Sequence, residues 1–362
     1  MRKPAIPSRR IQGLLLRWFE KNGRDLPWRR TRDPYAIWVS EIMLQQTQVK
    51  TVIPYYRRFL TAFPTVRHLA GADLSEVLRT WEGLGYYSRA RNLHQASKIV
   101  VNHYEGRIPD NLKDLLGLPG IGRSTAGGVL SFGFDKPAPI LDGNARRVLS
   151  RLYVISGNPV RRKTEDLLWE ISESLIPKGR SNPFNQALMD LGSMICTPKD
   201  PQCPRCPARN LCRGYLSGKP ERYPLRAVKK ALPHITACSA VIEKGKRVLL
   251  RQRLPKGLLG GLWEFPNWKT EGKSRLSLRL RNHIKKEMGL SIEVEGSMGV
   301  FRQTFSHFKL TLHVYRCRAV GRAGDGSWVP IKNLPNLPMS RIHRRIANSI
   351  SDRRLQIEKK TS

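Results

Sequence analysis

The stretch LLGLPGIGRSTAGGVLSF at residues 115–132 decides the fold of the first part of the chain. Its pattern predicts a helix, a tight turn containing Gly120 and Gly122, and a second helix capped by Ser124 or Thr125. Backbone N–H groups at such a turn and helix start favour a phosphate, so the two glycines are candidate phosphate-binding residues. An ordinary helical hairpin without a ligand is the alternative that this pattern leaves open.

The segments on both sides of the hairpin also have the apolar spacing of helices and end at glycine or proline. They are IQGLLLRWFEKNG at 11–23, SEIMLQQTQVKTVIPYYRRFLTAF at 40–63 and TEDLLWEISESLI at 164–176. Sustained alternation of the strand type does not occur before about residue 200. We therefore predict an all-α domain over residues 1–213.

The pattern changes after about Leu232. ITACSAVIEKGKRVLLRQR at 235–253 predicts two strands around a turn, FKLTLHVYRCRAV at 308–320 alternates like a strand, and LRLRNHIKKEMGL at 278–290 fits a helix. An α+β domain is therefore predicted over residues 234–355. Residues 214–233, which contain three prolines, are predicted to be the linker.

Charge is the strongest compositional feature. The 362 residues include 65 Lys and Arg against 28 Asp and Glu, which gives a formal net charge of +37, and both halves of the chain carry the excess. Such a chain repels itself unless a polyanion neutralises it, and nucleic acid is the usual polyanion. A general basic bias of the source genome is the alternative.

Apolar residues make up 40% of the chain, which is enough for packed cores and excludes a wholly disordered protein. Apolar runs of the roughly 20 residues that a membrane-spanning helix needs are absent from the sequence. The basic N-terminus lacks the apolar core and cleavage site of a signal peptide. We therefore expect no membrane association and a cytoplasmic location.

Four of the six cysteines gather in one stretch with the spacing C-x6-C-x2-C-x5-C: Cys196, Cys203, Cys206 and Cys212. In a cytoplasmic chain such a cluster indicates a metal site rather than disulfides. Four thiolates on one tight loop suit the four iron corners of a [4Fe–4S] cluster. Zinc is the alternative that the spacing alone leaves open.

Two acidic residues stand in distinctive settings. Asp142, in PILDGNARRV, follows an apolar run and precedes a Gly-Asn turn, where it can cap a helix. Glu41, Gln45 and Gln48 lie at i, i+4 and i+7, so a continuous helix would present one acid and two amides on one face. A solvated helix face is the alternative interpretation for these three residues.

Taken together, LPGIG, LDGN and the cysteine loop resemble the helix-hairpin-helix DNA glycosylase superfamily that includes endonuclease III. More closely, the chain resembles MutY-type adenine DNA glycosylases from about Leu14 to Arg318. The matching segments are LPWRRTRDPYAIWVSEIMLQQTQV at 26–49, WEGLGYYSRARNL at 81–93, FNQALMDLGSMICTPKDPQCPRCP at 184–207, GGLWEFP at 260–266 and FSHF at 305–308. MLQQTQV together with FNQALMDLG is far more specific than the hairpin.

The resemblance implies an enzyme that removes adenine mispaired with 8-oxoguanine or guanine in duplex DNA. The adenine must be flipped out of the stack before its N-glycosidic bond is cut. By analogy with the family, Glu41 protonates the leaving adenine, and Asp142, with Asn144 beside it, stabilises the cationic sugar. A [4Fe–4S] cluster on the four cysteines is implied as well.

Ser124 is an informative departure. Superfamily members that also nick the DNA strand carry a lysine here, one residue before a threonine, and form a Schiff base with the sugar. A serine cannot form one, so we predict a monofunctional glycosylase that leaves an abasic site. Some relatives have tyrosine at this position, which leaves the help that Ser124 gives to Asp142 undefined.

Substrate-binding residues are carried over position by position. The resemblance assigns adenine recognition to Arg24, Trp28, Arg29 and Gln186, and assigns Gln45 and Tyr86 to the gap beside the mispair. Tyr87 is the alternative to Tyr86 for this place, unless it belongs to the core. In the second domain, which resembles a Nudix fold, it places Phe305, Ser306 and His307 near 8-oxoguanine. Each assignment has an alternative. Trp28 could simply pack in the core, Gln186 could be a surface amide, and residues 305–307 could be a plain strand edge.

A Nudix hydrolase is not expected, because its G-x5-E-x7-R-E-x2-E-E motif needs several Mg²⁺-binding glutamates and the helix at 278–290 keeps only Glu287. Two other functions stay open. One is an endonuclease III-like glycosylase and lyase, against which Ser124 and the second domain argue. The other is a non-catalytic DNA-binding iron–sulfur protein, which would have no need of Glu41 and Asp142. We expect a monomer associated with the bacterial nucleoid.

Overall fold

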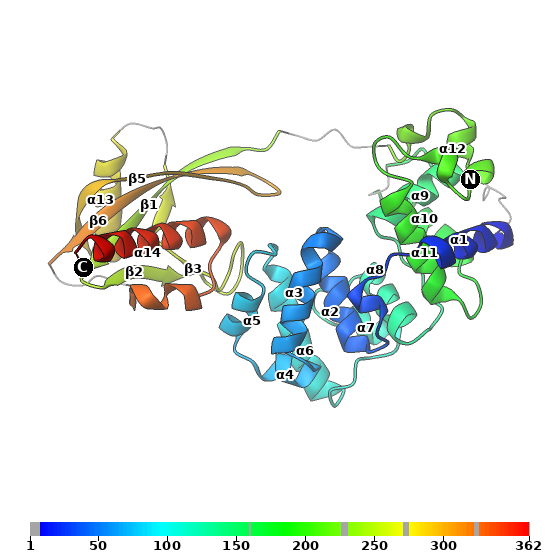
Figure 1. Ribbon diagram of the computed structural model, residues 1–362, viewed down its shortest axis with the longest axis horizontal. Helices are drawn as coiled ribbons and strands as arrows, with labels where there is room; N and C mark the ends of the chain where they lie inside the picture. Colours follow the sequence, from blue (N-terminus) through cyan, green and yellow to red (C-terminus); the bar gives the residue numbers. More distant parts are fainter. Residues whose placement is uncertain (1–7, 159–160, 226–230, 271–274, 322–325, 362) are drawn as a thin grey trace. The chain divides into compact units, whose positions relative to one another are not determined.

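The computed structural model describes residues 8–158, 161–225, 231–270, 275–321 and 326–361. It divides into two compact units, one of Met1–Gly71 with Asn92–Lys229 and one of Ala72–Arg91 with Lys230–Ser362. The first unit is helical and the second is α+β (Figure 1). This confirms the predicted fold class.

The first unit contains a series of short helices. They are α1 (Ser8–Asn22), α2 (Pro34–Leu44), α3 (Val49–Ala62), α4 (Val66–Gly71), most of α6 (Ser88–His103), α7 (Leu112–Leu116), α8 (Arg123–Gly128), α9 (Gly143–Tyr153), α10 (Arg162–Ser174), α11 (Ser181–Met194) and α12 (Arg213–Leu216). Helices α1, α9 and α11 pack through apolar faces that include Leu15, Leu149 and Leu188, all fully buried. This packing fixes α9 and α11, which carry much of the site described below.

The hairpin at 115–132 forms as α7, a turn and α8. Gly120 has φ +82, a conformation that residues with a Cβ rarely adopt. The predicted side-chain cap of α8 is wrong, because Gly122 is the N-cap and no side chain caps this helix end. Ser124 Oγ instead accepts a hydrogen bond from the backbone N–H of Leu141 at 3.3 Å.

The segment at 40–63 was expected to form one helix but forms two. Helix α2 ends at Leu44 and α3 begins at Val49, and Gln46 between them has φ +56. The left-handed backbone at Gln46 breaks the register, so Glu41, Gln45 and Gln48 do not share a helix face. Apolar periodicity alone does not reveal such a break, because the spacing stays helical on both sides of it.

Part of the segment predicted as a linker is folded. Helix α12 and the short turn η5 (Pro220–Arg222) lie within residues 213–222, and α12 packs on α9. The packing is close, because a Cβ on Gly214 would lie 2.8 Å from the carbonyl oxygen of Arg151. The first unit therefore extends past the cysteine stretch.

The second unit is a mixed sheet between two helices. Its elements are α5 (Leu74–Thr80), β1 (His234–Lys244), β2 (Arg247–Gln252), β3 (Trp263–Glu264), β4 (Asn267–Lys269), α13 (Leu276–Met288), β5 (Ser291–Thr304), β6 (Lys309–Val320), β7 (Ser327–Pro330) and α14 (Arg341–Thr361). The strand order is β3-β2-β1-β6-β5, with β1 and β6 parallel. Helices α13 and α14 cover opposite faces of the sheet (Figure 1), which explains why β1 is continuously buried at its centre.

The strands and helix predicted at 235–253, 278–290 and 308–320 are confirmed as β1 with β2, α13 and β6. The exposed side of α13 carries Arg279, Arg281, Lys285 and Lys286 next to Glu287. Among the residues that the structure describes, no helix is both long and apolar enough to cross a membrane.

Helix α8 approaches the segment before α9 very closely. A Cβ on Gly127 would lie 2.2 Å from the carbonyl oxygen of Pro139, which is backbone and cannot move aside cheaply. We predict that Gly127→Ala lowers the free energy of unfolding by about 1–2 kcal/mol, because the overpacking exceeds the gain in helix propensity. Denaturant unfolding measures the change.

Gly71→Ala is the matched control, because a Cβ on Gly71 meets nothing within 4 Å. Its free energy of unfolding should stay within about 0.5 kcal/mol of the parent. Equal stabilities of the two variants would contradict the close approach at Gly127.

Candidate active site

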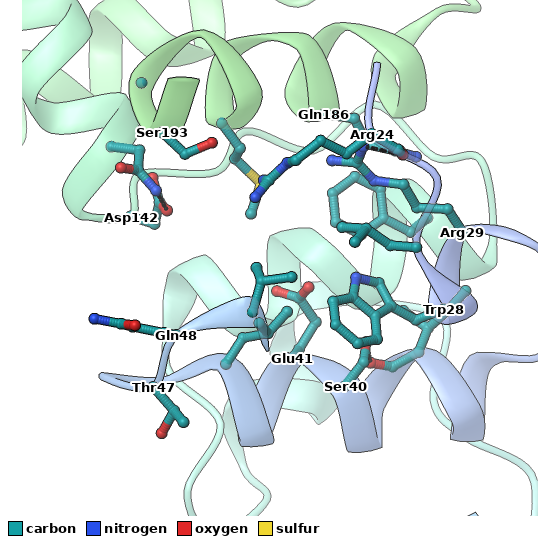
Figure 2. A pocket seen from close by; sticks show the side chains of 18 of the residues that line it. Arg24, Trp28, Arg29, Ser40, Glu41, Thr47, Gln48, Asp142, Gln186 and Ser193 are labelled. Carbon is teal, nitrogen blue, oxygen red and sulfur yellow. Dashed lines mark hydrogen bonds between the residues drawn. The ribbon is translucent and has the colours of Figure 1, made fainter. Parts of the chain in front are cut away.

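A cavity of about 520 Å³ opens among α2, the start of α3, the start of α9 and α11 in the first unit. Figure 2 shows Glu41 rising from α2 on one side and Asp142 facing it from the other. The cavity also has polar and cationic side chains around it: Arg24, Trp28, Arg29, Gln48, Asn144, Arg147, Asn182, Gln186 and Ser193. The two acids singled out from the sequence therefore meet in one pocket.

Glu41 has a carboxyl group that favours its protonated form. Burial, and secondarily the negative charge of Asp142, raise its pKa to about 8 against the opposing influence of Arg29. The carboxyl fits beneath α8 because residue 128 is glycine, where a Cβ would lie 2.5 Å from Glu41 Oε2. A carboxyl in this setting can donate a proton at neutral pH.

Asp142 is both a helix cap and a pocket residue. Its Oδ1 accepts a hydrogen bond from the backbone N–H of Ala145 at 2.7 Å, and its Oδ2 accepts one from Asn144 Nδ2 at 3.0 Å. Burial raises the pKa of Asp142, while these hydrogen bonds act in the opposite direction. The capping role expected as an alternative is therefore present together with the placement in the pocket.

Asp190 on α11 organises the cationic side of the pocket, and the sequence reasoning missed it. Its fully buried carboxylate accepts hydrogen bonds from Arg24 Nε at 2.7 Å and from Arg29 at 2.8 and 2.9 Å. Burial opposes the charge, but the two arginines outweigh it and hold the pKa of Asp190 below its usual range. Arg24 and Arg29 are thereby fixed beside the cavity, and Asp190 neutralises one of their two positive charges.

Trp28 and Gln186 also line the cavity. Trp28 is only 7% exposed and packs edge-on against Tyr56 with a centroid distance of 5.5 Å. Gln186 Nε2 donates a hydrogen bond to Asn182 Oδ1, so the two amides form a polar edge one helical turn before Asp190. Asn182 lies one helical turn before Gln186 on α11, so helical spacing from Gln186 could have revealed it as a second amide of the pocket.

Gln45 and Ser124 are placed at the hairpin rather than among the residues that line the cavity. Gln45 Nε2 donates hydrogen bonds to Thr125 Oγ1 at 3.1 Å and to the carbonyl oxygen of Gly120 at 3.4 Å. Ser124 bonds the segment that leads into Asp142. Both side chains therefore connect the hairpin to the elements that carry the two acids.

The four cysteines line one small cavity with Arg151 and Tyr215. Arg151 is almost fully buried and donates a hydrogen bond to Cys196 Sγ at 3.3 Å and to the carbonyl oxygen of Thr197 at 2.7 Å. Burial raises the pKa of Cys206 to about 12, so a thiolate here needs a cation bound to it. Among the described residues no three ligand side chains are grouped closely enough to hold a single metal ion.

Arg147 links the cysteine loop to the acid pocket. Its guanidinium donates to the carbonyl oxygens of Cys196, at 2.6 Å, and Gly192, at 2.5 Å, and to Asn144 Oδ1 at 2.8 Å. Asn144 in turn donates to Asp142. The sequence reasoning missed Arg147, although its place one turn before Arg151 on α9 is visible in GNARRVLSR.

In the second unit, residues 305–308 form the turn between β5 and β6. Phe305 stacks on Phe308 with a centroid distance of 4.5 Å, and the backbone N–H of Phe305 donates to the carbonyl oxygen of Phe308 at 2.8 Å. Ser306 and His307 are exposed at the tip, with Oγ and Nδ1 3.2 Å apart. The stacked phenylalanines thus support an exposed hydroxyl and imidazole.

Comparison with known proteins connects this geometry to a family. The model of the HhH-GPD superfamily base excision DNA repair proteins matches residues 39–174, and a NUDIX domain model matches residues 237–349. A structure of a thermostable thymine-DNA glycosylase is 33% identical, with a TM-score of 0.54, over 58% of this chain and 97% of that chain. An endonuclease III–DNA complex, 24% identical with a TM-score of 0.50 over 59% of this chain and 99% of that one, shares the fold.

Curated relatives extend across both units. The adenine DNA glycosylase of Buchnera aphidicola subsp. Acyrthosiphon pisum (strain APS) is 40% identical over 301 residues, which are 83% of this chain and 84% of that protein. The adenine DNA glycosylase of Homo sapiens is 36% identical over 383 residues, covering 90% of this chain and 69% of that protein. With two acids facing one pocket and relatives of this similarity, the chain belongs to the adenine DNA glycosylase family and acts on the N-glycosyl bond of adenine in DNA.

Proposed function

We propose that this glycosylase removes adenine opposite 8-oxoguanine or guanine in duplex DNA, and that it leaves an abasic site without cutting the strand. The observation that carries the proposal is the pairing of Glu41, whose pKa is raised to about 8, with Asp142 across one cavity. Cleavage of an N-glycosyl bond needs a proton for the leaving base and a negative charge near the sugar. The pocket offers one group suited to each need.

In the proposed mechanism the flipped adenine enters the cavity beside Trp28, and Gln186 hydrogen-bonds an edge of the base. Glu41 transfers its proton to a ring nitrogen of adenine while the bond between that base and C1′ breaks. The bonding electrons leave with the neutral adenine, and the positive charge left on the sugar faces Asp142. Water then adds to C1′ and releases a proton, which completes hydrolysis to the abasic site.

Strand cleavage is not expected, because Ser124 supplies no amine that could attack C1′. Arg146 lies close to Asp142 in the chain, but its guanidinium is always charged and pairs with Glu165. The rival endonuclease III-like lyase activity therefore has no nucleophilic amine in either position.

A [4Fe–4S] cluster is proposed on Cys196, Cys203, Cys206 and Cys212. The residues fit it, because the four thiols line one cavity, and burial raises the pKa of Cys203, Cys206 and Cys212, whose thiolates a bound cation would stabilise. When bound, the cluster would crosslink the loop through four Fe–S bonds. Arg147 and Arg151 hold this loop against α9, the helix whose N-terminus Asp142 caps.

Lesion recognition is proposed for the turn of Phe305, Ser306 and His307. Ser306 and His307 offer hydrogen-bonding atoms at an exposed tip, which is the kind of group that can distinguish 8-oxoguanine from guanine. The basic exposed side of α13, with Lys286 at a position of the Nudix glutamates, gives no support to nucleotide hydrolysis by this unit.

The function is tested by single-turnover cleavage of a duplex with one 8-oxoguanine:A pair and separately labelled strands. We predict a break in the adenine strand only after heating with alkali. The rate constant should fall as pH rises through about 8, because Glu41 then loses its proton.

Glu41→Gln should bind the duplex and leave it uncut at every pH. A break without alkali would establish lyase activity, and turnover by the variant would remove Glu41 as the acid.

The same variant tests the raised pKa through stability. The pKa of Glu41 is 4.5 in the unfolded chain and about 8 in the folded chain. Between these two pH values the folded chain holds a proton that the unfolded chain has lost, so the free energy of unfolding decreases as the pH rises through this window. Glu41→Gln should therefore be more stable than the parent at pH 7, by up to about 3 kcal/mol. Below about pH 4.5 the two stabilities should converge.

The cofactor is tested by metal analysis of the purified chain. We predict about four irons per chain and the broad visible absorption of an iron–sulfur cluster. Cys206→Ser should lose iron, whereas Cys238→Ser, at a buried cysteine on β1 far from the loop in sequence, should keep it. Stoichiometric zinc in place of iron would contradict the proposal.

The lesion turn is tested by the ratio of single-turnover rates on 8-oxoguanine:A and G:A duplexes. We predict that replacing Ser306 and His307 by alanine lowers this ratio about tenfold, as expected for loss of one or two hydrogen bonds. Ser277→Ala, an exposed serine on α13, is the control and should leave the ratio unchanged. An unaffected ratio in the double variant would assign recognition to another element.

A further inference from the structure

Residues 72–91 belong to the same compact unit as residues 230–362. The sequence predicts them to be part of the glycosylase domain. This segment contains α5 and the WEGLGYY sequence that follows it. Three of its side chains, Glu82, Tyr87 and Arg91, hydrogen-bond to residues of the C-terminal part of the unit. None of them is assigned a role by the proposed mechanism.

The Glu82 carboxylate is the most heavily bonded of the three. Arg344 Nε donates to its Oε1 at 2.6 Å, and Arg344 Nη2 and the backbone N–H of Met339 donate to its Oε2 at 3.0 Å each. The side chains of Glu82 and Arg344 are only 16% and 19% exposed. A two-pronged, partly buried pair of this kind is among the stronger and more directional ion pairs.

Arg344 is itself held in place from the other side. It donates to the carbonyl oxygens of Leu334 at 2.8 Å and Leu337 at 2.6 Å, so its guanidinium is oriented before it meets Glu82. A charge fixed in this way loses little side-chain freedom when it pairs. The pair therefore ties the start of α14 and the turn before it to the WEGLGYY segment.

Two further residues that hold the segment, Tyr87 and Arg91, follow Tyr86 in the sequence. The Tyr87 hydroxyl donates to the carbonyl oxygen of Met339 at 3.1 Å and accepts from the backbone N–H of Gly83 at 3.3 Å. Arg91 donates to the carbonyl oxygens of Gly260 and Gly257, both at 3.0 Å. The backbone is thus anchored before and after residue 86.

Tyr86 itself points outward from this anchored segment. It is 42% exposed, and its φ of +48 is unusual for a bulky side chain and costs about 1–3 kcal/mol. The Arg89 guanidinium lies 5.4 Å from the Tyr86 ring centroid. A conformation that costs energy persists only when the surrounding contacts impose it, and the anchors on either side are such contacts.

We propose that Glu82 is a positioning residue for catalysis: by pairing with Arg344 and Met339 it fixes the backbone that presents Tyr86 to the DNA. The C-terminal residues thereby set the geometry of the aromatic side chain that enters the duplex beside the mispair. This inference rests on the proposed insertion of Tyr86. It makes Glu82 and Arg344 determinants of the cleavage rate, although neither touches adenine.

The test is a double-mutant cycle in the full-length chain, with Glu82→Gln and Tyr86→Ala made singly and together. The readouts are the single-turnover rate on an 8-oxoguanine:A duplex and the fluorescence of a 2-aminopurine placed next to the mispair, which reports unstacking. Glu82→Gln should lower both about tenfold when Tyr86 is present. In the Tyr86→Ala background it should lower them less than about twofold, because the residue through which it acts is gone.

Two more variants separate positioning from general destabilisation. Arg344→Lys keeps the positive charge but cannot bridge both carboxylate oxygens, and it should show a smaller, equally Tyr86-dependent loss. Glu293→Gln removes an exposed ion pair with Arg318 in the same unit and should leave both readouts unchanged. Thermal unfolding of each variant confirms that the comparison is made between folded chains.

The double-mutant cycle distinguishes failure of the positioning role from failure of the proposed insertion of Tyr86. Equal losses from Glu82→Gln in both backgrounds, or no loss in either, would overturn the positioning role while leaving Tyr86 insertion intact. If Tyr86→Ala alone changed neither the rate nor the fluorescence, the proposed insertion of Tyr86 would fall, and the role of Glu82 with it. The adenine glycosylase activity itself would survive either result.

Discussion

The two acids can share one cavity only because the backbone segments around it approach more closely than side chains would permit. A Cβ on Gly128 would meet the Glu41 carboxyl, and a Cβ on Gly192 would lie 2.6 Å from Asn144 Cβ. Glycine at these two positions lets α8 close over the acid and lets α11 contact the start of α9. Burial of Glu41, and with it the raised pKa, follows from this closeness.

Charge inside the first unit is arranged in two different ways. Arg24 and Arg29 share the single carboxylate of Asp190, so the three side chains together keep one net positive charge at the pocket wall. Arg147 and Arg151 instead bond mainly to carbonyl oxygens, which satisfies their N–H groups and leaves their positive charge in place. Burial raises the pKa of Asp142, whereas the positive charge of Arg147 lowers it and so favours the carboxylate form that the proposed mechanism requires.

Local sequence patterns were sufficient for the fold class and for the main strands and helix of the second unit, whereas Glu41 and Asp142 were singled out only with the family resemblance, because each alone also fits a solvated helix face or a helix cap. The patterns failed at Gln46, because a single left-handed residue breaks a helix without disturbing the apolar spacing around it. They also missed Asp190 and the Glu82–Arg344 pair, whose partners are separated by 166 and 262 residues. Such pairs carry no local signature, because each member alone looks like an ordinary surface charge.

Asp142 combines two duties that usually belong to different residues, since one carboxylate caps α9, lines the cavity and, in the proposed mechanism, faces the reacting sugar. Asparagine caps a helix about as well as aspartate but carries no charge. Asp142→Asn, which replaces one carboxylate oxygen by an amide nitrogen, should therefore preserve the fold and abolish the proposed chemistry. Under the proposed function, such a variant is expected to bind the mispair without turning it over and so to shield the site from other repair proteins.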